Sequence, residues 1–288
     1  MSIGEENPKY LQRLSLVNAL KSRYGRSLVL AFYIGFSSNS NEALCKLLAS
    51  LALDKKAYCE KYGIHGLKPE MWPSGILPEA VRCDRGSEFR SKEFSRICEA
   101  LNIEKMLVPG GSGSLKGNVE QFFHQYHSNI NVFTESKSLI LKDYGSKHHI
   151  EAALNINEIT RMTLLYIIYY NNTQMDQYPL TKEMTEEGLI PTPTNIYEFG
   201  VRHFGTPSFI GDRRQFYLNL LPRAKASLNK FGIHFRGLTF VDVHNPELVE
   251  LMLKTQQKKI QVDILYDPAD ISHIYYLNSE KEYCDILL

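Results

Sequence analysis

The stretch from Cys83 to Phe123 constrains the fold of this 288-residue chain more than any other segment. It begins with CDRGSEF (83–89), directly after a short apolar run, and ends with KGNVEQFF (116–123). Between them lie an amphipathic segment, a second apolar run and a Gly/Ser loop. These patterns predict a strand at 80–83, a helix from Ser91 to Leu101, a strand at 103–108, a loop at 109–114 and a helix from Lys116. We therefore expect an α/β fold in which both strands belong to one sheet.

Two carboxylates stand at chemically useful places in this stretch. Asp84 directly follows a buried strand, and Glu120 lies in the first turns of a helix, opposite its apolar stripe. Carboxylates from separate elements provide the oxygen ligands that Mg²⁺ prefers, and Mn²⁺ is an alternative at the same site. Such metal ions assist phosphodiester chemistry by activating the attacking oxygen and stabilising the leaving oxygen. Taken singly, each residue is explained as well by a turn or a solvated helix surface, but the pair favours a metal site.

The helix that begins at Lys116 has two distinct faces. Its apolar stripe indicates packing in a core rather than base stacking, and consists of Val119, Phe122, Phe123, Tyr126, Ile130 and Phe133. The opposite face carries Glu120, His124, His127 and Asn131, of which we interpret His124 and Asn131 as residues that line DNA. Lys116 is suited to a phosphate contact as a point charge, and a solvated helix start explains it equally well. The two histidines lack a third ligand, so zinc is not indicated.

Charge is distributed unevenly, although the chain as a whole has a formal net charge of +1. From Arg202 to Arg236 there are seven basic residues and one acid, whereas the chain from Thr239 onward has four basic and nine acidic residues. We interpret six of the basic residues as contacts to DNA phosphates, and they are Arg213, Arg214, Arg223, Lys225, Lys230 and Arg236. The alternative is an ordinary solvated protein surface.

The rest of the chain supplies further elements. We expect an amphipathic helix at 11–21, a buried strand at 27–36, a helix at 42–62, and an apolar helix at 156–172 that Asn157 caps. A Pro-containing connector follows, and then short strands at 216–221, 226–235, 238–243, 260–266 and 273–277 with one helix at 246–257. Regular short strands with Gly and Pro turns predict a small β-barrel.

Cysteine usage and hydropathy bear on the compartment. The five cysteines are scattered without a CxxC pair, so neither a zinc site nor a disulfide framework is indicated, and a reducing cytoplasm is expected. No apolar run approaches the roughly 18 residues of a membrane span. We therefore expect a cytoplasmic, DNA-associated protein with no membrane partner.

Several segments carry a resemblance to a known family. The sequences DRGSEF (84–89) and KGNVEQFF (116–123) resemble the D-D-E integrase and transposase cores. Four later segments resemble the C-terminal half of TnsB-type transposases, which are relatives of phage Mu transposase. These segments are YNNTQMDQYPLTKEM, GLIPTPTNIYEFG, LNLLPRAKASLNKFGIHFRGLTF and VDILYDPADISHIYYL. The resemblance covers roughly residues 24–280. It implies an RNase H-like core, a mixed sheet flanked by helices, followed by a helical connector and a small C-terminal β-barrel that contacts DNA.

The resemblance also assigns roles to residues. Asp84 resembles the second catalytic Asp of the D-D-E triad, Glu120 the catalytic Glu, and Lys116 part of the lead-in to that Glu. The first catalytic Asp is expected near Ser22 or Arg23, but no Asp or Glu occurs between Asn7 and Asn41. The chain therefore resembles an N-terminally truncated transposase with a poorly represented first strand, and two carboxylates alone would hold metal ions weakly.

These features predict four segments: a short N-terminal segment at 1–23, an incomplete catalytic core at 24–178, a connector at 179–205 and the barrel at 206–288. The expected function is DNA transposition, in which 3′-OH element ends are joined to target DNA, with impaired catalysis in this chain. A non-catalytic DNA-binding or assembly fragment is the alternative, and an RNase H-like nuclease is a weaker one. The expected partners are element-end and target DNA, other transposition subunits including an ATPase regulator, and further copies on DNA.

Overall fold

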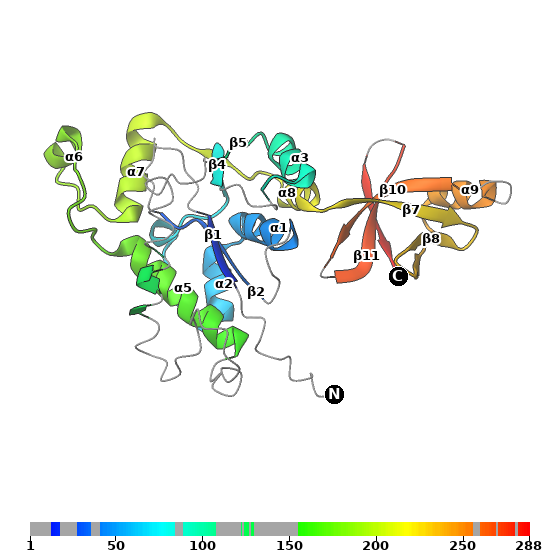
Figure 1. The fold of residues 1–288 in the computed structure, drawn as a ribbon, viewed down its shortest axis with the longest axis horizontal. Coiled ribbons are helices and arrows are strands. Elements are labelled where there is room, and N and C mark those ends of the chain that lie inside the picture. The colour runs from blue at the N-terminus through cyan, green and yellow to red at the C-terminus, as the bar shows by residue number, and fades with distance from the viewer. Residues whose placement is uncertain are drawn as a thin grey trace. The chain divides into compact units, whose positions relative to one another are not determined.

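The computed structural model of the chain describes residues 28–35, 41–83, 89–107, 122, 124–126, 128–129, 155–255, 260–268, 270–279 and 282–288, and the backbone alone of 13–17 and Arg82. These residues belong to two compact units, Met1–Phe216 and Tyr217–Leu288 (Figure 1). Each unit is described by itself. In the part of the chain described, no helix is both long and apolar enough to cross a membrane.

The described strands of the first unit form three pairs. β1 (Arg13–Val17) and β2 (Ala31–Gly35) are antiparallel, β3 (Ile76–Leu77) pairs with β6 (Ser208–Phe209), and β4 (Ala80–Cys83) runs parallel to β5 (Glu104–Leu107). The predicted helix at 11–21 is therefore wrong where the backbone is described, because Arg13–Val17 pairs with β2 over five residues. The fold is mixed α/β, and the single RNase H-like sheet remains a prediction.

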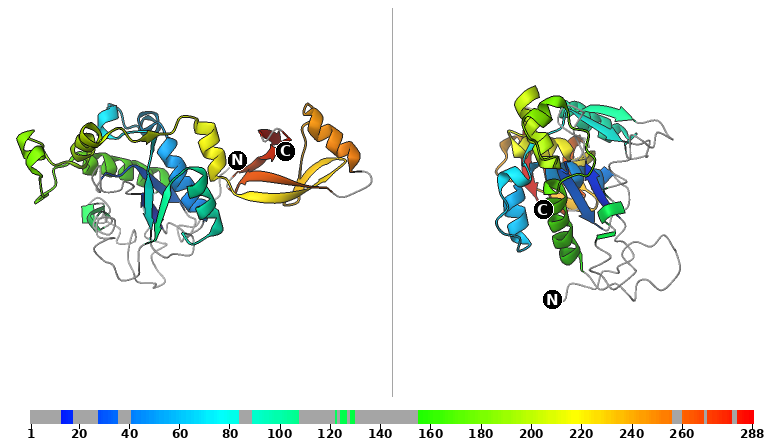
Figure 2. Two further views of the ribbon diagram at one scale, coloured as in Figure 1. Left: turned by 90° about the horizontal axis from the view of Figure 1, so that it is seen from above. Right: turned by 90° about the vertical axis from the view of Figure 1, so that its left-hand side faces the viewer.

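The first unit also contains helices. Those with described bounds include α1 (Asn41–Ala49), α2 (Lys55–Lys61), α3 (Lys92–Ala100), α5 (Ile156–Asn172), α6 (Lys182–Glu186) and α7 (Pro193–Phe204), with short 3₁₀ turns η2 (Ser50–Ala52) and η3 (Pro69–Met71). The main core joins α5 to β2, which lie against each other in Figure 2. In it, Leu164 and Ile167 of α5 pack with Phe32 and with Trp72, all of which are buried.

One long helix predicted at 42–62 is broken in the structure. Ser50 ends the first part, because its hydroxyl donates to the carbonyl oxygen of Leu47 at 2.7 Å and accepts from the backbone N–H of Phe32 at 3.1 Å. The chain is then extended at Leu53 and Asp54, and the Asp54 carboxylate caps α2 by accepting from the backbone N–H of Ala57. Gly63 follows α2 with φ of 70°, as expected for a helix stop.

Helix α5 has the predicted bounds but a different cap. The side chain of Asn155, rather than that of Asn157, accepts from the backbone N–H groups of Asn157 and Glu158 at 2.9 and 3.0 Å. The Glu158 carboxylate accepts from the Asn155 N–H in return, at 2.8 Å, which completes a capping box. This reciprocal pair explains why the helix begins one residue after Asn155.

Asn155→Ala is therefore expected to lower the free energy of unfolding by about 1 kcal/mol, because it leaves two N–H groups at the helix start without their acceptor. Asn157→Ala is the matched control, since it removes the same side chain two residues later and leaves the cap intact. Urea unfolding followed by Trp72 fluorescence would measure both variants. A larger loss in Asn157→Ala would contradict the assignment of the cap.

In its described residues the second unit contains an antiparallel sheet of six strands in the order β12-β11-β10-β7-β8-β9. Its elements are β7 (Arg223–Asn229), β8 (Gly232–Phe235), β9 (Leu238–Phe240), α9 (Pro246–Lys254), β10 (Ile260–Asp267), β11 (Asp270–Leu277) and β12 (Tyr283–Leu287). The backbone N–H of Val241, just after β9, donates to the carbonyl oxygen of Leu287 in β12 at 3.2 Å. This bond links the two edges, so the sheet curls on itself, as a barrel-like architecture requires.

Two predictions in this region are wrong. The expected strand at 216–221 is the helix α8 (Arg213–Leu220), which starts after Asp212 because the Asp212 carboxylate accepts from the backbone N–H of Gln215. The expected single strand at 226–235 is a hairpin, because the chain turns at Lys230 and Phe231. Alternating apolar residues at 216, 218 and 220 suggested a strand, yet Leu218 packs against Leu265 and Tyr275 from within a helix.

Candidate functional site

The parallel pair β4–β5 defines the edge at which the candidate site is expected. Its register aligns Ala80 with Glu104 and Cys83 with Leu107, so both strands end at the same edge. Asp84 directly follows Cys83, and the segment that carries Lys116 and Glu120 follows β5 along the chain. Parallel strands joined through a helix place their carboxyl ends together, which is where open α/β sheets bind ligands. The two carboxylate-bearing segments therefore leave the sheet from neighbouring strands.

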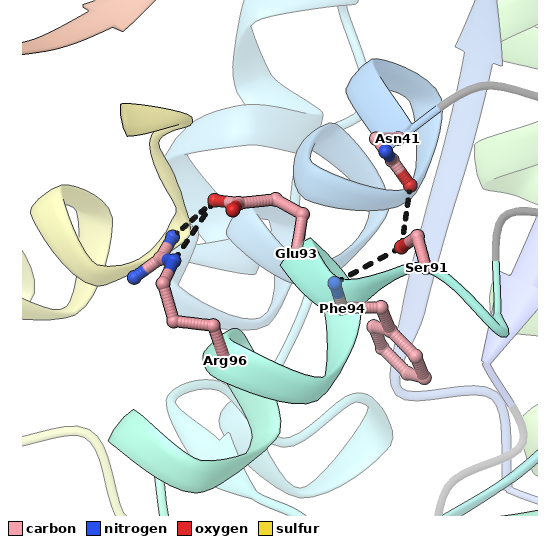
Figure 3. Close-up of polar contacts among 5 residues, drawn as sticks. All are labelled: Asn41, Ser91, Glu93, Phe94 and Arg96. Carbon is pink, nitrogen blue, oxygen red and sulfur yellow. Dashed lines mark hydrogen bonds and ion pairs between the residues drawn. The ribbon is translucent and has the colours of Figure 1, made fainter. Parts of the chain in front are cut away.

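Helix α3 follows the Asp84 segment, and its start is firmly held. The Ser91 hydroxyl accepts from the backbone N–H of Phe94 at 3.1 Å, as predicted for the helix cap, and donates to the side-chain oxygen of Asn41 at 3.0 Å (Figure 3). Asn41 is the first residue of α1, so this bond joins the N-terminal ends of two helices. Glu93 and Arg96 form a separate ion pair of 2.6 Å on the first turns of α3.

Contacts from β5 hold the other side of this helix. Lys105 donates from Nζ to the Ser95 hydroxyl at 2.6 Å and to the Phe89 carbonyl oxygen at 3.4 Å. The rings of Phe89 and Phe94 meet edge to face with centroids 5.6 Å apart. The chain is therefore fixed at Cys83 on one side of Asp84 and at Phe89 on the other.

The helical residues 122, 124–126 and 128–129 test the two faces predicted for the Glu120 helix. Phe122 and Tyr126 are 1% and 5% exposed and belong to the core with α5, so the prediction that their stripe forms a core is confirmed for these two residues. The Tyr126 hydroxyl lies 2.7 Å from that of Thr163, and burial raises the pKa of Tyr126. His124 is exposed, on the opposite side from this core.

Four other predicted site residues lie outside the part of the chain that the structure describes. They are Asp84, Lys116, Glu120 and Asn131, and their roles remain predictions. Among the described residues, no group of three or more His, Cys, Asp or Glu side chains could hold a metal ion.

The six predicted phosphate contacts fall into different elements. Arg213 and Arg214 are exposed at the start of α8 and belong to the first unit, whereas the other four belong to the second. Arg223 and Lys225 lie on the exposed face of β7, where residues alternate between exposed and less exposed. Lys225 is directly opposite Asp263 of β10, a neighbouring acid that sequence reasoning missed because it depends on strand register.

Arg236 is held in place by aromatic residues. Its guanidinium lies 4.7 Å from the centre of the Tyr266 ring and 5.4 Å from that of Phe235, and it donates to the Tyr266 hydroxyl at 3.2 Å. The side chain is nonetheless exposed, at a turn where Arg236 has φ of 49°. A guanidinium stacked in this way is oriented before it meets a ligand. Tyr266 is a second residue that the sequence pattern did not reveal.

Both units are similar to parts of known transposition proteins. A family model described as the TnsB C-terminal domain matches residues 9–135, and one described as Mu transposase, C-terminal, matches residues 217–285. The chain is 26% identical over 253 residues to the Transposon Tn7 transposition protein TnsB of Escherichia coli. This chain is similar to the TnsB-type transposases. The alignment spans 86% of this chain but only 36% of the Escherichia coli protein.

The two matched regions contain most of the candidate residues. The TnsB match includes Asp84, Glu120 and the rest of the Glu120 face, and the Mu match begins at residue 217, where the second unit also begins. Arg223, Lys225, Lys230 and Arg236 therefore lie within the Mu-type region. Arg213 and Arg214 lie in neither match, so their assignment rests on charge and exposure alone.

Proposed function

We propose that this chain is a DNA transposition protein whose TnsB-type core, when its carboxylate set is complete, joins 3′-OH element ends to target DNA. The observation that supports this most is the parallel β4–β5 pair, from whose common edge the segments bearing Asp84 and Glu120 depart within the TnsB match. An RNase H-like core would extend this pair with β1 and β2 into one sheet.

Asp84 and Glu120 would hold the metal ion of this reaction. Their carboxylates suit Mg²⁺, and Mn²⁺ as a substitute, because both ions prefer oxygen ligands. When bound, the ions would supply charge stabilisation at the attacking and leaving oxygens of the phosphodiester. Lys116 would orient a phosphate, and His124 and Asn131 would line the DNA on the exposed side of their helix.

The catalytic power of this chain alone is expected to be small. Between Asn7 and Asn41 there is no Asp or Glu to act as the third carboxylate of a D-D-E set. With pre-cut element ends, target plasmid and Mg²⁺ or Mn²⁺, the 288-residue chain should join no more DNA than its Glu120→Gln variant. If the unmodified chain gives joined product that Glu120→Gln abolishes, the impairment is disproved while the transposase function stands.

A second candidate function is DNA binding or assembly without catalysis, which the exposed basic residues favour. Phosphate contacts make affinity depend on salt, with the slope of log K against log salt changing by about 0.9 for each contact. Two double variants test these contacts, Arg213→Ala with Arg214→Ala and Arg223→Ala with Arg236→Ala. Each should reduce the magnitude of that slope by about 2. Fluorescence anisotropy with a labelled duplex at several salt concentrations between about 50 and 200 mM would measure it.

Two controls accompany these variants. Lys56→Ala with Lys61→Ala removes the same charge from exposed positions of α2 and should leave the slope unchanged. Asp84→Asn should also preserve binding, because a metal ligand is not needed for phosphate contact. Equal loss in the α2 control would indicate a response to total charge rather than to these residues.

In either function the partners that we propose are element-end and target DNA, further copies on DNA, and other transposition subunits including an ATPase regulator.

A further inference from the structure

The turn between β7 and β8 exposes an aromatic ring at the tip of a narrow hairpin. Asn229 pairs with Gly232, so the turn consists of Lys230 and Phe231 alone. Phe231 is 64% exposed, among the highest values for large apolar side chains in the described residues. The Lys230 ammonium lies 4.8 Å from the centre of the Phe231 ring. The tip therefore presents an exposed ring beside a cation, and Phe231 is not among the core residues of this unit.

The tip is fixed rather than loose. The Asn229 side chain accepts from the backbone N–H of Phe231 at 2.7 Å, which sets the direction of the turn. Gly232 has φ of 133°, and a Cβ there would collide with the carbonyl oxygen of Phe240 in β9, so β8 and β9 approach closely at this point. On the core side, Leu228 and Ile233 are 1% and 0% exposed. The hairpin is thus anchored by buried residues immediately behind its exposed tip.

The charge of the β7–β8 hairpin itself favours a polyanion. No Asp or Glu occurs from Arg213 to Leu238, and the exposed face of β7 that leads to the tip carries Arg223 and Lys225. Asp263 lies opposite Lys225, which is four residues before the end of β7, so this acid is not at the tip. One exposed ring is also far smaller than the apolar patches of several hundred Å² that mark protein docking sites. A single aromatic wedge with flanking cations suits a nucleic acid better than a protein surface.

We propose that the β7–β8 tip is a DNA wedge, in which Phe231 inserts between neighbouring base pairs of a duplex while Lys230 leaves the ring for the flanking phosphate. The inference rests on the DNA binding proposed above and adds a contact to the bases themselves. Apolar side chains that enter from the minor groove unstack a base step and kink the duplex. Pyrimidine–purine steps unstack most easily, so a TA step is the preferred target.

The test uses the full chain and a duplex of about 30 base pairs with 2-aminopurine at a central TA step and a fluorophore pair at its ends. The unmodified protein should raise the 2-aminopurine fluorescence on binding and bring the DNA ends closer. Phe231→Ala should lose both signals and bind about tenfold more weakly, since one stacked aromatic commonly changes affinity by about 5- to 100-fold. Phe204→Ala, a ring 55% exposed on α7, is the matched control and should behave like the unmodified protein.

Three outcomes would overturn the wedge. The first is binding by the unmodified protein without a 2-aminopurine signal, and the second is retention of that signal by Phe231→Ala; both leave the proposed DNA binding intact. The third is self-association of the unmodified chain without DNA that Phe231→Ala abolishes in sedimentation, which would make the ring a contact between copies. Absence of any DNA binding at low salt would instead reject the proposed function together with the wedge.

Discussion

Leu248→Ala is expected to lower the free energy of unfolding of the second unit by about 3 kcal/mol. Leu248 is fully buried and packs from α9 into the core of the curled sheet, among Phe240, Ile264 and Ile274. Removing its branched side chain loses burial and leaves a cavity that a closed sheet fills poorly. Hydrogen–deuterium exchange in β10 and β11 would report the loss as faster exchange, because those strands line the same core.

The position of α9 makes this effect difficult to relieve. The Asn245 side chain accepts from the Leu248 backbone N–H at 3.0 Å. The Glu247 carboxylate accepts from the Tyr276 hydroxyl and from the Ser279 hydroxyl, each at 3.0 Å. The helix is therefore pinned at its first turn and cannot slide to fill the cavity.

Leu253→Ala in the same helix is the matched control. Leu253 is 65% exposed, so its loss should change stability by no more than about 0.5 kcal/mol. Equal destabilisation by the two variants would mean that α9 does not close this core in solution.

Elements with local signals could be predicted from the sequence. The strand at Ala80–Cys83 and the helix after Ser91 have the expected bounds because an apolar run and a capping side chain act within a few residues. The burial of Phe122 together with the exposure of His124 also follows from helical spacing alone. The sequence therefore sufficed for the elements that surround the candidate carboxylates.

Elements that depend on distant contacts could not be predicted. The break after Ala49 depends on Ser50, whose hydroxyl bonds to Phe32 eighteen residues away in sequence. The strand Arg13–Val17 has a helix-like pattern and exists through pairing with β2. Local propensity gives way to tertiary contacts in both cases.

The same limit applies to the candidate DNA-binding residues. Charge alone identified Lys225 and Arg236, but the acid opposite Lys225 and the ring beneath Arg236 come from β10, about 30 to 40 residues later. Strand register decides both contacts, and no periodicity within β7 or β8 encodes it. The electrostatic character of this surface is therefore a property of the folded sheet.

A buried lysine in the first unit gives the second large effect. Lys55 is 1% exposed, its ammonium donates to the carbonyl oxygen of Ser50, and it lies 5.3 Å from the centre of the Trp72 ring. Burial lowers the pKa of Lys55 from 10.5 to about 7, with a smaller opposing effect of Cys59. Between these two pKa values the unfolded chain binds more protons than the folded one, so stability rises with pH and falls as the pH drops toward 7.

We expect the free energy of unfolding to rise by about 2 kcal/mol from pH 6 to about pH 8.5 because of this lysine. Lys55→Met should remove that pH dependence. Met has a similar length and no charge, so at pH 6 the variant should be more stable than the unmodified chain, and the difference should shrink as pH rises. Urea unfolding followed by fluorescence of Trp72, the single tryptophan, reads this unit directly.

The difference between the two proteins at each pH isolates Lys55, because every other titratable group is present in both. Lys56→Met removes an exposed lysine from the next position of α2 and should shift stability by the same small amount at every pH. A difference between Lys55→Met and the unmodified chain that stays constant from pH 6 to about 8.5 would show that Lys55 keeps its proton throughout. In that case the carbonyl of Ser50 and the ring of Trp72 stabilise the buried ammonium enough to offset its desolvation.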